Sequence, residues 1–152
     1  MTKTSNLAPY SERVIPGLSF FFATLFVPTA LYLIVLAFDD FWALFTFVTA
    51  EVAIVCLGLF AAPTLRLSKE SLSIGKVEIP SQFVKSVMVI EASAQQSEKG
   101  PKLHPAAYVR FQVGVKGLLK VELNDPTDPT PYWLVSSRNP ELVAKKFADL
   151  TS

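Results

Sequence analysis

The hydrophobic pattern of the chain changes once, near residue 63. Before that point two long apolar runs, 14–38 and 41–62, are separated only by Asp39 and Asp40. As helices they would measure roughly 37 and 33 Å, enough to cross the about 30 Å hydrocarbon core of a bilayer. The pattern therefore predicts a transmembrane helical hairpin over residues 14–63, with an Asp of the turn capping the second helix.

After residue 63, apolar and polar positions alternate as in half-buried strands. Segments 71–74 and 77–80 flank Gly75-Lys76, a pair suited to a tight hairpin turn. Further alternating segments are 82–93, 108–114, 117–125 and 132–136, whereas 94–105 is polar, contains Gly and Pro, and is predicted to be a loop. Short strands at this spacing predict a small antiparallel β domain, either a sheet or a barrel.

The chain is predicted to end in a helix over residues 140–150. Asn139 suits the N-cap position and Pro140 the first helical position. Val143, Phe147 and Leu150 recur at helical spacing and form a stripe that can pack on the sheet. The predicted organisation is thus an N-terminal juxtamembrane segment at 1–13, the hairpin, and a β-rich domain with a C-terminal helix at 64–152.

Composition supports this division and excludes several functions. The 152 residues are 51% hydrophobic and 18% charged, below the quarter typical of soluble domains. A net charge of +1 provides no basic field for nucleic acid. One His and one Cys argue against most enzyme classes, so we expect no enzymatic activity, no metal site and no cofactor.

The positive residues predict the orientation of the hairpin. Lys3 and Arg13 precede the first run, and Arg66, Lys69 and Lys76 follow the second, whereas the turn has no Lys or Arg. Positive flanks are retained on the cytoplasmic side. We therefore expect a two-pass protein of the cell membrane with both termini cytoplasmic.

Glu51 is the one acidic residue inside the apolar runs. A carboxylate near the bilayer centre costs about 2.5–3.5 kcal/mol or more, so Glu51 should be neutral, paired or facing water. Counted from the turn, it lies level with Pro28 and Thr29. Pro28 leaves the Thr24 carbonyl without its helical partner. Glu51 could bond that carbonyl or the Thr29 hydroxyl as interhelical glue, or it could contact another membrane protein.

Residues 125–147, DPTDPTPYWLVSSRNPELVAKKF, are the most specific stretch. They resemble the C-terminal DPxDPTPYWLVSTR motif of an actinobacterial family of small integral membrane proteins of unknown function. Two upstream segments, YSER at 10–13 and AYV at 107–109, are similar to further segments of that family. The resemblance implies a membrane location and no known activity. Residues 65–87 also resemble bacterial pleckstrin-homology-like (PH-like) domains that follow membrane helices.

The motif has a physical interpretation of its own. Asp125 and Asp128 can accept hydrogen bonds from nearby backbone N–H groups, while Pro131 and its neighbouring prolines keep the chain extended. This stiff corner feeds the last strand, where successive side chains point to opposite faces. We therefore expect only one of the rings of Tyr132 and Trp133 to face the core. The other ring, together with Arg138, could form a contact for a partner or a lipid headgroup, as the alternative to a purely structural corner. A Ca²⁺ site at the two Asp residues is the weaker alternative.

These features leave three functional hypotheses. The first is a non-enzymatic module in which the hairpin anchors a cytoplasmic domain that docks a partner protein at the inner membrane face. The second is sensing of anionic lipid, and the third is an accessory subunit of a transporter or cell-envelope synthesis complex, bound through Glu51 and the Gly58 face. Small residues spaced four apart also leave homo-oligomerisation open.

Overall fold

The structure, a computed structural model, describes residues 9–151, with the side chain of Thr151 excepted. They divide into a β unit (9–14, 63–111 and 115–151) and a helical unit (15–62 and 112–114). Residues 1–8 of the predicted juxtamembrane segment, including Lys3, and Ser152 lie outside the described residues.

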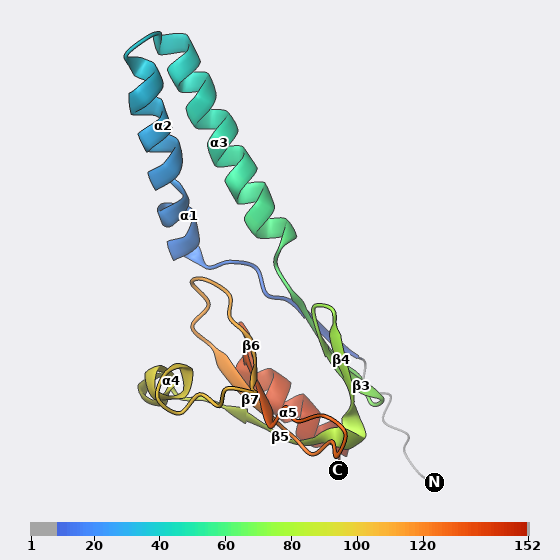
Figure 1. Ribbon diagram of the computed structural model, residues 1–152. Coiled ribbons are helices and arrows are strands. Elements are labelled where there is room, and N and C mark those ends of the chain that lie inside the picture. The colour runs from blue at the N-terminus through green and yellow to red at the C-terminus, as the bar shows by residue number, and fades with distance from the viewer. Residues whose placement is uncertain (1–8, 152) are drawn as a thin grey trace. The chain divides into compact units, whose positions relative to one another are not determined.

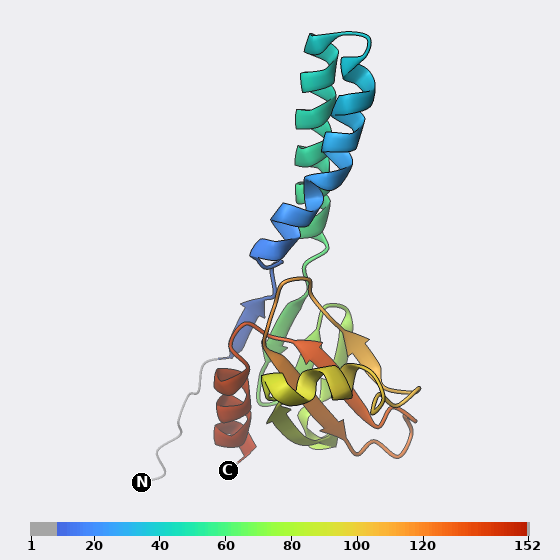
Figure 2. The same ribbon diagram turned by 90° about the vertical axis from the view of Figure 1, so that its left-hand side faces the viewer.

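The helical unit is a hairpin, drawn in blue to green in Figures 1 and 2. Its first arm comprises α1 (Leu18–Thr24) and α2 (Phe26–Leu36), and its second arm is α3 (Asp40–Phe60). The arms are 19 and 21 residues long, and their apolar windows are only 11% and 6% buried within the chain. A core helix of a soluble protein would be mostly buried, so this exposure fits helices that face lipid. The predicted hairpin is confirmed.

The turn of the hairpin follows the predicted chemistry. Asp39 has extended backbone dihedrals, and its carboxylate accepts a 3.0 Å hydrogen bond from the Trp42 N–H. This bond satisfies one of the free donors at the start of α3. Phe38, Phe41 and Trp42 beside it are exposed, as aromatic residues at a membrane interface commonly are.

The β unit consists of two four-stranded sheets and a C-terminal helix, which confirms the predicted fold class. The first sheet has the order β1-β2-β3-β4 and the second the order β5-β7-β8-β6. The first sheet contains β1 (Tyr10–Arg13), β2 (Thr64–Leu67), β3 (Ser71–Ile74) and β4 (Val77–Pro80). After the short 3₁₀ turn η1 (Ser81–Phe83), the second contains β5 (Val84–Val89), β6 (Tyr108–Arg110), β7 (Leu118–Leu123) and β8 (Tyr132–Ser136).

Strand pairing is antiparallel except between β6 and β8, which run parallel. The β3–β4 hairpin has the predicted two-residue turn, with Gly75 at φ +65°. Glycine adopts this left-handed conformation at little cost, which suits the first central position of a hairpin turn.

The strand β1 was not predicted from the sequence. It pairs with β2 in the register Arg13↔Thr64, and the ladder is extended by a 2.8 Å bond from the Val14 N–H to the Pro63 carbonyl. Chain segments on the two sides of the hairpin are therefore neighbouring strands of one sheet. The helical hairpin is a long insertion between β1 and β2.

The predicted loop 94–105 begins as a helix instead, α4 (Ala92–Lys99). Its residues are Ala, Gln, Ser, Glu and Lys, most of them good helix formers, but they carry no apolar stripe that would reveal a helix by periodicity. Two side chains attach α4 to β7 and to the segment just before it: Glu98 pairs with Lys120 of β7 at 2.9 Å, and Gln95 Nε2 donates to the Lys116 carbonyl at 2.8 Å.

The main core of the β unit lies between the sheets and α5 (Pro140–Thr151). Val143 and Phe147 of α5 are buried in it and Leu150 is partly buried, as the helical stripe predicts. A second, smaller cluster on the other face of the second sheet comprises Leu118, Tyr132 and Leu134, packed against Ile90, Leu103 and Ala107. Both faces of β8 are therefore covered.

Candidate functional site

Inside the hairpin, Glu51 on α3 contacts Thr24 at the end of α1. Glu51 Oε1 lies 2.8 Å from Thr24 Oγ1, and that hydroxyl lies 2.8 Å from the Phe21 carbonyl oxygen. Glu51 Oε2 is buried and has no hydrogen-bond partner among the described residues. The carboxyl group is thus turned toward the first arm, and one of its oxygens is held there.

The predicted partner Thr29 does not take part. Thr29 is exposed, whereas Thr24 and Pro28 are buried. Thr24 and Pro28 are four residues apart and share one helix face, while Thr29 is displaced from that face. The sequence predicted that Glu51 bonds to the first arm near Pro28. The hydroxyl that it contacts belongs to Thr24, five residues farther than Thr29 from the turn of the hairpin.

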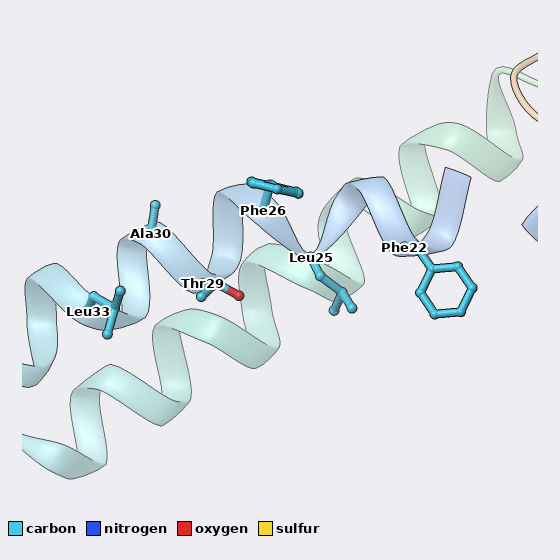
Figure 3. A pocket seen from close by; sticks show the side chains of 6 residues that line it. All are labelled: Phe22, Leu25, Phe26, Thr29, Ala30 and Leu33. Carbon is cyan, nitrogen blue, oxygen red and sulfur yellow. The ribbon is translucent and has the colours of Figure 1, made fainter. Parts of the chain in front are cut away.

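The first arm is interrupted at Leu25, between α1 and α2. Pro28 has no N–H to donate to the Thr24 carbonyl, so the regular helical bonding cannot continue through this turn. Beside the interruption lies a shallow groove of about 360 Å³ on the exposed side of the arm (Figure 3). It is lined by Phe22, Leu25, Phe26, Thr29, Ala30 and Leu33.

The prediction of an exposed aromatic ring beside Arg138 is wrong. Trp133 is only 3% exposed in the main core, and Tyr132 is 8% exposed in the second cluster. The two rings do point to opposite faces of β8, but α4 and the segment that follows it cover the second face. The Tyr132 hydroxyl accepts a 2.8 Å bond from the His104 N–H, and its ring lies 4.4 Å from Lys120 Nζ. Arg138 alone is exposed.

The two Asp-Pro-Thr repeats form the predicted turns. Asp125 Oδ1 accepts from the Thr127 N–H at 2.8 Å, and Asp128 Oδ1 accepts from the Thr130 N–H at 2.8 Å. The hydrogen bonds from Thr130 lower the pKa of Asp128 below its usual 3.8. The Pro131 carbonyl accepts from the Leu123 N–H at 3.1 Å and so begins the β7–β8 pairing. The motif therefore acts as a corner that delivers the chain into β8.

Glu12, which is only 8% exposed on β1, was not predicted to be a site residue. Its Oε2 accepts from the Tyr10 hydroxyl and from Ser137 Oγ, both at 2.9 Å, and its Oε1 accepts from the Arg138 N–H at 2.5 Å. We call Tyr10, Glu12, Ser137 and Arg138 the Glu12 cluster. It joins the strand before the hairpin to the segment between β8 and α5.

The Glu12 cluster also affects Tyr10. Burial first, and then the adjacent Glu12 carboxylate, raise the pKa of the Tyr10 hydroxyl above its usual 10.0. Tyr10 and Glu12 belong to the YSER segment, and Ser137 and Arg138 belong to the C-terminal motif. The one available signal was that both segments carry the family resemblance. The structure shows that they are parts of one hydrogen-bonded cluster.

Metal ligation finds no support in the part of the chain that the structure describes: no three His, Cys, Asp or Glu residues there lie close enough together to hold an ion. His104 is exposed, and its Nδ1 accepts from the nearby Ala106 N–H at 3.2 Å. Asp125 and Asp128 each bind their own turn.

Residues 9–147 match a protein family described as "Protein of unknown function (DUF3093)". No curated protein and no solved structure matches the chain. The match covers the strand β1, the hairpin, both sheets and most of α5. The expected resemblance to a family of unknown function is thereby confirmed over most of the chain, while the actinobacterial source and the PH-like relationship stay predictions.

Proposed function

The chain belongs to the DUF3093 family of proteins of unknown function, and we propose that it is a membrane-anchored interaction protein without enzymatic activity. In this proposal the hairpin crosses the cell membrane twice, both termini are cytoplasmic, and the β domain binds a partner protein at the inner membrane face.

The observation that carries the proposal is the way the β domain is attached. Only residues 14–17 separate β1 from α1, and only residues 61–63 separate α3 from β2. Because β1 and β2 are paired neighbours, both ends of the hairpin begin in the same sheet. Two short connections hold a folded domain at the membrane surface more closely than one long linker would, which suits a domain that presents a binding surface there.

The use of the buried polar groups supports a role in binding over one in catalysis. Glu12 and Ser137 bind each other and the backbone around them, and the Tyr132 hydroxyl binds the 102–104 segment. A catalytic site needs a reactive group directed toward a substrate-sized space. The hydroxyl and carboxyl groups of Glu12, Ser137 and Tyr132 are instead bonded to the surrounding chain, so they stabilise the fold.

A second candidate is an accessory subunit of a larger membrane complex. It is favoured by the groove on α1 and α2, which carries large apolar side chains with exposed fractions of 66% at Phe22 and 81% at Phe26 (Figure 3). In that case the hairpin, not the β domain, would provide the contact.

A hairpin exchange separates the two candidates. Residues 18–60 would be replaced by an unrelated two-helix hairpin of equal length and orientation, and partners would be cross-linked in native membranes and recovered. Docking by the β domain predicts that the partner of the wild-type chain is also recovered with the exchanged chain. Its loss, with the β domain still folded, would support the accessory-subunit candidate. Recovery of anionic lipid and no protein would contradict both.

A further inference from the structure

The number of hydrogen atoms available around Thr24 bears on the protonation state of Glu51. The Thr24 hydroxyl has one hydrogen and two acceptor lone pairs. It lies 2.8 Å from the Phe21 carbonyl and 2.8 Å from Glu51 Oε1. The Phe21 carbonyl can only accept, and so can an ionised carboxylate, so the single Thr24 hydrogen cannot serve both neighbours fully. The arrangement that gives both short contacts a hydrogen of their own directs the Thr24 hydrogen to Phe21. The short distance to Glu51 Oε1 is then a full hydrogen bond only if Glu51 supplies the hydrogen.

The surroundings of Glu51 Oε2 lead to the same conclusion. That oxygen is buried without a partner in the described chain. In a neutral carboxylic acid it is a carbonyl oxygen, for which a missing hydrogen bond is a moderate cost. In an ionised carboxylate it would carry half of a buried charge, and the acid would share a single hydroxyl hydrogen with Phe21. Burial of a charge with so little compensation is far more costly.

Among residues 15–62 of the hairpin, no cationic side chain is present to balance an ionised Glu51. The other titratable groups of residues 15–62 are Tyr32, Asp39, Asp40 and Cys56. Tyr32 packs against the Phe47 ring, and Cys56 is exposed five residues farther along α3. The two Asp residues of the turn lie more than ten residues away, roughly 17 Å along the helix. They are also negative, so they would not favour a second anion.

We propose that Glu51 is a proton-binding site inside the membrane hairpin and that the bound proton is a structural part of it. The acid donates from Oε1 to Thr24 Oγ1, and Thr24 donates to the Phe21 carbonyl. This relay runs from α3 to the interrupted turn of the first arm, where Pro28 has removed the regular helical bond. The proton therefore stabilises the contact between the arms at the point where the first arm is weakest. The inference is independent of the proposed partner binding.

Infrared spectroscopy of the full-length chain in neutral phosphatidylcholine nanodiscs tests the site directly. The difference spectrum of wild type minus Glu51→Gln at neutral pH should contain the carbonyl stretch of a protonated carboxylic acid. In Thr24→Val that band should persist but shift, because the acid loses its acceptor. A carboxylate signature in place of the protonated band would overturn the proposal.

A stability comparison provides the second readout. Glu51→Gln keeps a neutral donor and should leave the unfolding equilibrium of the hairpin close to that of wild type. Thr24→Val and Glu51→Ala should each shift the unfolding equilibrium of the hairpin toward the unfolded state about three- to twentyfold. The double variant should shift it by no more than the larger of the two single effects, because both substitutions remove the same interaction. Thr29→Val, an exposed Thr on the same arm, is the matched control and Thr24→Ser the rescue. Equal destabilisation of the hairpin by Glu51→Gln and by Glu51→Ala would contradict the relay.

Discussion

At the scale of single residues, Glu12 shows how a charged side chain can serve as a core residue. It occupies the buried position of β1 because three donors surround its carboxylate, from Tyr10, Ser137 and Arg138. A carboxylate has two oxygens that can accept these hydrogen bonds. An amide in the same place has only one accepting oxygen, and its NH₂ group would face the remaining donors, so it is less favourable there.

Glu12→Gln should therefore lower the free energy of unfolding of the β unit by about 1–3 kcal/mol. Denaturant unfolding can be followed by Trp133 fluorescence in a Trp42→Phe background. Glu70→Gln, at an exposed position between β2 and β3, is the matched control. If the two substitutions had equal effects, the Glu12 cluster would contribute nothing to stability.

Tyr10 gives this cluster a pH dependence with a definite sign. Its pKa is raised in the folded chain by burial and by Glu12, so the folded state holds the phenol proton more tightly than the unfolded state. The stability that this hydroxyl contributes is complete below about pH 10 and is lost as the pH rises through the raised pKa. The difference in unfolding free energy between wild type and Tyr10→Phe should be constant up to about pH 10 and shrink above it. A difference that grew with pH would show that the phenol is not held as described.

Sequence separation explains which of these residues could be predicted. The Asp39 cap and the turns at Asp125 and Asp128 bind backbone groups two or three residues away, so local chemistry identifies them. The bonds Glu51–Thr24 and Glu12–Ser137 join residues 27 and 125 positions apart. Their partners depend on the helix interruption and on the placement of β1, neither of which follows from residue type alone.

At the scale of elements, Gly58 lets the two arms of the hairpin approach closely. A Cβ atom at this position would lie 2.2 Å from Cζ of Phe20. Gly58→Ala should therefore force the Phe20 ring aside and destabilise the hairpin by about 1–3 kcal/mol, and the smaller side chain of Phe20→Leu should restore most of the loss. Thermal unfolding in detergent measures both. The oligomerisation hypothesis predicts instead a change in association that depends on the protein-to-detergent ratio and that Phe20→Leu does not rescue.

Gly17 and Gly114 show why the predicted strand 108–114 is short. Strand β6 ends at Arg110, and residues 112–114 join the helical unit, where the Gly17 N–H donates to the Val113 carbonyl at 2.8 Å. A Cβ atom on Gly17 would lie 2.0 Å from the Gly114 carbonyl oxygen. The period-two pattern of Val109, Phe111 and Val113 continues past Arg110, but the chain leaves the sheet there and turns at Gly114, whose φ of +74° favours glycine, to make this close backbone contact with Gly17.

Gly17→Ala should break this contact. The loss of one hydrogen bond worth about 1 kcal/mol should accelerate exchange of the residue 17 amide hydrogen by roughly five- to tenfold, measured by hydrogen–deuterium exchange with mass spectrometry. Gly100→Ala, whose new Cβ would meet its nearest atom at 3.1 Å, is the control and should leave that exchange unchanged. If the exchange rate of this amide hydrogen is the same in Gly17→Ala as in wild type, the hydrogen bond to the Val113 carbonyl is not formed in solution.

At the scale of the whole molecule, the decisive property is that the hairpin is inserted within a sheet. Hydrophobic length identified the two arms, and period-two alternation identified most of the strands. The strand before the hairpin escaped detection because its single buried side chain is Glu12. Without that strand the sequence describes a membrane anchor followed by a domain. With it, residues on both sides of the hairpin belong to the same folded unit, so a truncation that removes every residue before 63 also removes β1 from the first sheet.

Because the hairpin is inserted between two paired strands, its orientation in the membrane also decides on which side the β unit lies. Residues on both sides of the hairpin fold together, so in a membrane they must be on the same side, and the Lys and Arg residues that flank the hairpin predict that this side is the cytoplasm. In a Cys56→Ser background, Phe38→Cys at the turn should react with a membrane-impermeant maleimide on intact cells. Lys69→Cys, between β2 and β3, should react only after permeabilisation. The reverse labelling would place the β domain outside the cell, where a cytoplasmic partner could not reach it, and labelling of both sites on intact cells would show that the arms do not span the membrane.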